Sequence, residues 1–156
     1  LAATLPKLAA ARPAAQPIRI WSAACSTGQE PYSIAMLAAD TLPGRRVEIL
    51  ATDISREIVE RAREGAFTQF EVQRGLPIRS LMKHFRQDGG RWRVSDALRG
   101  MVRFEERNLL GELSSVGKFD AIFCRNVMIY FDKPTKTRVL EALARQLAPD
   151  GSLYLG

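Results

Sequence analysis

Polar residues directly follow three apolar, strand-like runs in this sequence. The segment 23–30 (Ala-Ala-Cys-Ser-Thr-Gly-Gln-Glu) follows the first run, Asp53 follows the second, and Arg125 and Asn126 follow the third. In an open parallel sheet, ligands bind beyond the carboxyl ends of the strands, near the point where the strand order reverses. We therefore expect these segments to form one ligand site.

The composition of segment 23–30 argues against a nicotinamide dinucleotide. Small residues such as Ala24 let a ligand approach the backbone, and the helix expected next offers unpaired N–H groups. Only one glycine is present, so no GxGxxG fingerprint can be drawn, and a ligand that needs no pyrophosphate cradle fits better. Glu30 is a candidate ligand contact, although Thr27 and Glu30 also match a Thr-x-x-Glu capping box.

Asp53 stands where an acidic residue accepts hydrogen bonds from the ribose hydroxyls of adenosine-containing ligands. The alternative is an N-cap for the helix that follows, a role that Ser55 could also fill. Arg125 and Asn126 are hard to explain as packing residues at the tip of a buried strand. A buried arginine needs a carboxylate partner, and a substrate could supply it.

Catalysis by histidine or by a bound metal finds few candidates here. The single histidine, His84, lies in a basic stretch away from these segments, and we expect it at the surface. Cys25 and Cys124 are far apart, lack metal-binding spacing, and are expected to be free thiols. No Ser-His-Asp, Cys-His or metal site is predicted. A reaction whose nucleophile is an ionised carboxylate would need no general base.

The order of the elements along the chain indicates an α/β fold. Strands are expected at 18–22, 47–52, 119–123 and 152–155, and helices at 31–39, 55–63 and 134–147. Such alternation is typical of a doubly wound, mostly parallel sheet. We interpret residues 1–17 as the end of a helix that leads into a domain spanning 18–156. Gly65 is expected to end the second helix.

A small antiparallel β insertion is predicted at 88–106. A Gly-Gly turn precedes the alternating run 91–94, and a second run at 101–105 is expected to join the main sheet. Most of the chain's net charge of +6 falls here, because residues 79–107 hold eight arginines and lysines against four aspartates and glutamates. Such a patch fits nucleic acid, an acidic protein partner or a solvated face.

The motifs closely resemble those of CheR-type chemoreceptor glutamate methyltransferases. The string 21–36 is similar to that family's cofactor loop, and the strings 51–55, 108–110 and 123–131 are similar to three more of its motifs, in the family's order. The resemblance runs over essentially the whole chain. It implies a Rossmann-like methyltransferase fold that uses S-adenosylmethionine and releases S-adenosylhomocysteine.

The resemblance also implies roles for individual residues. The positions that it assigns to cofactor binding are Ala24, Glu30, Asp53, Asn108, Leu109, Arg125 and Asn126. Tyr130 is expected to line the active site with Arg125, and the insertion to meet the partner. The positive charge of this stretch, not the resemblance, suggests that Arg91 and Arg93 attract that partner. The partner would be the cytoplasmic helices of a chemoreceptor, whose glutamates become methyl esters, and in some members the receptor's C-terminal peptide. We expect a cytoplasmic monomer with no nucleic-acid partner and no membrane insertion.

Two parts of the family pattern are expected to be absent from this chain. These are the N-terminal helical domain, with an Asn-x-Thr-x-Phe-Phe-Arg-like segment, and the closing strands at the C-terminus. Two alternative functions stay open. One is a non-catalytic module that binds S-adenosylmethionine as a scaffold or sensor. The other is a methyltransferase acting on RNA, which the sequence pI of about 9.8 suggests.

Overall fold

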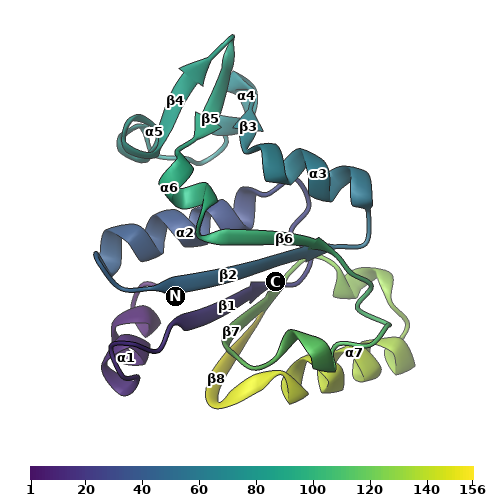
Figure 1. Cartoon of the computed structure of the whole chain (residues 1–156). Coiled ribbons are helices and arrows are strands. Elements are labelled where there is room, and N and C mark those ends of the chain that lie inside the picture. Colours follow the sequence, from purple (N-terminus) through teal and green to yellow (C-terminus); the bar gives the residue numbers. More distant parts are fainter.

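A five-stranded sheet forms the centre of the computed structural model, which describes residues 1–156 (Figure 1). Its strands are β1 (Ile18–Ser22), β2 (Val47–Asp53), β6 (Val102–Glu106), β7 (Phe119–Cys124) and β8 (Leu147–Leu155), in the order β6-β2-β1-β7-β8. All neighbouring pairs are parallel. The strand order reverses between β1 and β7, so a ligand is expected at the carboxyl ends of these two strands. The predicted doubly wound, mostly parallel sheet is confirmed.

Helices cover both faces of this sheet. On one face lie α1 (Thr4–Ala11), α2 (Gln29–Thr41) and α3 (Arg56–Glu64), and on the other lies α7 (Lys133–Arg145). Strand β1 contributes to both layers because its side chains alternate: Ile20 packs toward α2, and Trp21 packs toward α7. The predicted end of α3 is also confirmed, since Gly65 follows it with a φ of 65°.

A second, antiparallel sheet forms a small subdomain, residues 66–94, beyond α2 and α3. Its strands are β3 (Ala66–Phe67), β4 (Phe85–Asp88) and β5 (Arg91–Val94), in the order β3-β5-β4, and it includes helices α4 (Gln69–Gln73) and α5 (Ile78–His84). The chain then passes through α6 (Asp96–Arg99) into β6 of the main sheet. The antiparallel part therefore lies earlier in the chain than the expected 88–106. Strand β3 has only two residues, too few to show an alternating pattern.

The small subdomain is tied to α2 by two contacts on one carboxylate. Lys83 Nζ donates to Asp40 Oδ1 at 2.5 Å, and His84 Nε2 lies 3.2 Å from the same oxygen. Both contacts lower the pKa of the Asp40 carboxyl, and the hydrogen bond from Lys83 has the larger effect. His84 is only 6% exposed. The expectation of a surface histidine was wrong, because α5 lies against the core and its last residue turns inward.

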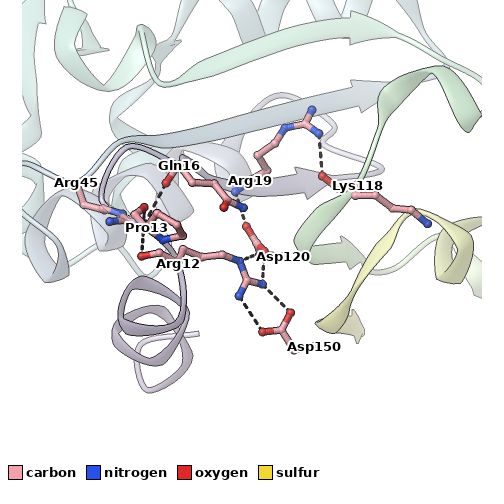
Figure 2. Close-up of polar contacts among 8 residues, drawn as sticks. All are labelled: Arg12, Pro13, Gln16, Arg19, Arg45, Lys118, Asp120 and Asp150. Atoms are coloured by element: carbon pink, nitrogen blue, oxygen red, sulfur yellow. Dashed lines mark hydrogen bonds and ion pairs between the residues drawn. The ribbon is translucent and has the colours of Figure 1, made fainter.

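Arg12, which directly follows α1, bonds this segment to strands β7 and β8 of the main sheet (Figure 2). The guanidinium donates to Asp120 Oδ1 at 2.7 and 3.1 Å and to the two oxygens of Asp150 at 2.6 and 2.9 Å. Asp120 also accepts a hydrogen bond from the backbone N–H of Arg19, and Arg45 donates to the carbonyl oxygens of Arg12, Pro13 and Gln16.

None of the helices has the length and apolar character needed to span a bilayer.

Candidate functional site

A cleft of about 790 Å³ opens at the carboxyl ends of β1, β2 and β7. Five of the residues predicted from sequence to form the cofactor site lie together on its wall: Ala24, Glu30, Asp53, Arg125 and Asn126. They come from three separate stretches of the chain, which the parallel sheet brings to one edge. The cleft lies at the reversal of strand order, where the topology places a ligand.

Backbone hydrogen bonds hold the loop between β1 and α2 at the floor of the cleft. Ala23 N donates to Phe123 O at 2.7 Å, and Cys25 N donates to Thr52 O at 2.9 Å. The buried Thr52 hydroxyl accepts from Trp21 Nε1 and donates to Ala23 O. The loop is thus bonded to the strands on either side of β1, which gives the cleft a fixed floor.

The carboxylate of Asp53 is held by two backbone N–H groups. Oδ2 accepts from Ser26 N at 3.0 Å, and Oδ1 accepts from Ser55 N at 3.2 Å. The side chain of Ser55, not of Asp53, caps α3 by accepting from Ile58 N. The N-cap alternative for Asp53 is therefore wrong. Each carboxylate oxygen retains acceptor capacity for a ligand in the cleft.

Glu30 lies in the first turn of α2 and bridges two strand ends. Its Oε1 accepts from Ser22 Oγ at 2.7 Å, and its Oε2 lies 3.5 Å from Arg125 Nη1. The capping-box alternative is wrong, because Gly28 occupies the N-cap position without a side-chain bond and Thr27 donates to Gln29. Arg125 was expected to be buried, but its side chain is 52% exposed. Its carboxylate partner is Glu30.

Three other predicted site residues do not line this cleft. Asn108 is exposed, and its Oδ1 accepts from Leu110 N at 2.9 Å in a local turn. Leu109 is buried in the α7 side of the core. Tyr130 lies in the short helix η2 (Met128–Tyr130) after Asn126 and is 78% exposed. Asn126 itself has a φ of 60°, a left-handed conformation that asparagine tolerates better than most residues.

Arg91 and Arg93 lie on β5, in the hairpin of the small subdomain. Arg93 Nε donates to Asp88 Oδ2 at 2.8 Å, and its Nη1 donates to Glu64 O at 3.0 Å. Arg91 lies 4.0 Å from a Glu64 carboxylate oxygen and is 49% exposed. Of the two, Arg91 has the freer charge.

The structure adds residues to the site that were not predicted from the sequence. Ser33 and Leu37 line the cleft from the same face of α2 as Gln29 of the predicted segment 23–30, at the i, i+4, i+8 spacing that could have indicated them. Phe123 lines it from β7 and stacks on Tyr154 of β8 at 4.5 Å. Cys25 is a free thiol whose pKa burial raises to about 12, so it stays protonated near neutral pH.

Comparison with solved structures shows the same fold in methyltransferases. The DszA carbon methyltransferase aligns with a TM-score of 0.63 and 18% identity over 99% of this chain and 33% of that one. The glycopeptide N-methyltransferase MtfA, solved with S-adenosyl-L-methionine, aligns with a TM-score of 0.59 and 11% identity over 99% of this chain and 53% of that one. At these identities the likeness concerns the fold alone.

Sequence comparison identifies the family. A chemotaxis protein methyltransferase of Vibrio parahaemolyticus is 44% identical over 97% of this chain and 56% of its own length. The Escherichia coli K12 chemotaxis protein methyltransferase is 46% identical over 88% of this chain and 50% of its own length. The chain thus spans about half the length of these relatives. The model of the family described as "CheR methyltransferase, SAM binding domain" matches residues 2–156, and the chain belongs to this family.

Proposed function

We propose that the cleft binds S-adenosylmethionine and that the protein transfers its methyl group to glutamate side-chain carboxylates of chemoreceptors. Membership in the CheR family and the names of the relatives support this proposal. The observation that carries it is the carboxylate of Asp53, held at the end of β2 and open to the cleft. A carboxylate at this place suits a pair of ribose hydroxyls.

The cleft fits the size and chemistry of this cofactor. Its volume of about 790 Å³ lies within the range of small-molecule sites. Small residues such as Ala24 and Ser26 let an adenosine approach the backbone, while Glu30 and Arg125 offer both charges to the amino-acid end. On the family resemblance we also propose cofactor contacts for Asn108 and Leu109, from the loop after β6, although neither side chain lines the cleft.

Methyl transfer to a carboxylate does not require this chain to supply a general base. S-adenosylmethionine supplies an electrophilic methyl group, and an ionised glutamate is the nucleophile without help from a base. The chain's single histidine lies in the small subdomain, contacts Asp40 of α2, and does not line the cleft. Tyr130, exposed beside the cleft-lining segment, is proposed to orient the acceptor glutamate.

Calorimetry with S-adenosylmethionine and S-adenosylhomocysteine tests the cofactor assignment. Asp53→Ala should weaken binding by about 2–3 kcal/mol, since the ribose hydroxyls lose a charged acceptor. Asp53→Asn keeps one oxygen for the loop contact with Ser26 and separates loss of charge from loss of loop order. Asp96→Asn on α6, away from the cleft, is the matched control and should bind like wild type. Unchanged affinity in a folded Asp53→Ala protein would contradict the assignment.

The partner is proposed to be an acidic receptor helix in the cytoplasm, met by the positive surface of the small subdomain. Arg91 and Arg93 lie on that surface, and long-range attraction to several glutamates would raise the rate of encounter. The edge strand β4 leaves backbone groups on which an extended receptor tail could add a strand.

A further inference from the structure

The last residue of β1, Ser22, is a polar side chain in an apolar position. Alternate residues of a strand point to the same face, so Ser22 follows Ile18 and Ile20 on the face that packs against α2. Ser22 is fully buried, with 0% exposure. A hydroxyl buried in such a place is costly unless it has a hydrogen-bond partner.

The partner of Ser22 is a residue of the cleft. Ser22 Oγ donates to Glu30 Oε1 at 2.7 Å, a length typical of a hydrogen bond to an ionised carboxylate. Because Ser22 lies at the end of a central strand paired on both sides, its hydroxyl has little freedom to move. The bond therefore fixes one oxygen of Glu30 relative to the sheet.

The other interactions of Glu30 do not fix its position in the same way. Arg125 contacts the second oxygen only at 3.5 Å, and its side chain is 52% exposed to water. The amino end of α2 favours a negative charge but does not direct individual oxygens. The short contact from Ser22 is thus the one that orients this carboxylate toward the cleft.

We infer that Ser22 is a positioning residue, which holds Glu30 in the orientation that binds the cofactor. This inference rests on the proposed function, because it assumes that Glu30 contacts S-adenosylmethionine. Ser22 does not itself line the cleft and would act through Glu30.

A double-mutant cycle, with S-adenosylmethionine affinity measured by calorimetry, tests the inference. Ser22→Ala should weaken binding about tenfold, the loss expected for one hydrogen bond to a charged group. In a Glu30→Ala background, which leaves no side-chain oxygen to accept from Ser22, the same change should cost less than about twofold, because the oriented carboxylate is already gone. A purely structural effect of Ser22 would weaken binding equally in both backgrounds, and that result would overturn the inference.

Two further measurements keep the outcome clear. If Ser22→Ala fails to fold, Ser22→Cys, a near-isostere with a weak donor, replaces it in the cycle. Wild-type affinity in a folded Ser22→Ala protein would refute the role of Ser22 while leaving the cofactor assignment intact. If the wild-type protein itself binds no S-adenosylmethionine, the proposed function fails and the inference fails with it.

Discussion

At the scale of single residues, Arg125 and Tyr130 are expected to differ in kind. Arg125 lines the cleft and pairs with Glu30, so Arg125→Ala should weaken cofactor binding by about two- to fivefold, as for a partly exposed ion pair. Tyr130 lies outside the cleft lining, so Tyr130→Phe should leave cofactor affinity unchanged and lower kcat, by roughly ten- to a hundredfold if it aligns the acceptor. Calorimetry and receptor methylation at saturating cofactor separate the two effects. Loss of cofactor binding in Tyr130→Phe with normal kcat would reverse these roles.

Cys25 is a cleft residue that is expected to be chemically inert. Mainly because the thiol is buried, the pKa of Cys25 is raised to about 12. Burial likewise raises the pKa of Cys124, on the neighbouring strand β7, to about 11. Since the thiolate is the reactive form, neither residue should react with iodoacetamide at pH 8 in the folded protein. Both should react in urea, which serves as the control. Labelling of folded Cys25 at the rate of a free thiol would show that the loop opens.

At the scale of elements, the β4–β5 hairpin carries the prediction about partners. Arg91→Glu should slow receptor methylation through the association rate, more strongly at low salt than at high salt. Arg93 is a poorer test residue, because its bonds to Asp88 and the Glu64 carbonyl stabilise the hairpin itself. Arg138→Glu, on the exposed side of α7 across the main sheet, makes the same change of charge as a control.

The Arg91→Glu protein should retain wild-type affinity for S-adenosylmethionine. Receptor methylation at the wild-type rate in low salt would mean that the subdomain's positive surface is only solvated. A loss of the same size in Arg138→Glu would indicate a general effect of net charge rather than a docking surface.

Elements with strong local patterns were predicted well from the sequence, and non-local ones were not. The five strands expected in the main sheet, including the run 101–105 that forms β6, and the residues after three of them could be identified because these runs are short and clearly bounded. Strand β3 was not predicted, because it pairs with a strand far along the chain: Ala66 lies opposite Arg93 of β5. The burial of His84 and the pairing of Arg125 with Glu30 depend on contacts between elements, which no local pattern encodes.

At the scale of the whole molecule, Arg12 joins the segment after α1 to β7 and to Asp150 of β8. Its side chain is 11% exposed, and that of Asp120 is 7% exposed. Removing the guanidinium would leave the Asp120 carboxylate buried without a cation. The loss of one partner of a buried ion pair costs about 3–5 kcal/mol, and water reaching the half-exposed Asp150 places this case near the lower end.

The dependence of stability on acid pH should also reveal the contribution of the Arg12 guanidinium. The hydrogen bond from Arg12 lowers the pKa of Asp150 in the folded protein. A carboxyl with a lowered folded pKa contributes stability that is present above its unfolded pKa, about 4, and is lost as pH falls through the folded value. Without Arg12 this part of the acid-induced loss should disappear.

Arg12→Gln should therefore destabilise the protein by about 3 kcal/mol at pH 7, which corresponds to a fall in Tm of roughly 6–12 °C for a chain of this size. Urea unfolding at pH 7 and at pH 3.5 measures both consequences, since the difference between mutant and wild type should shrink at the lower pH. Arg46→Gln is the matched control, because that arginine is 68% exposed and its pair with Glu48 should contribute less than about 1 kcal/mol. Equal effects of the two substitutions would mean that the Arg12 contacts do not hold α1 to the sheet. An undiminished difference at pH 3.5 would assign the stabilisation to the packing of the arginine stem rather than to its charge.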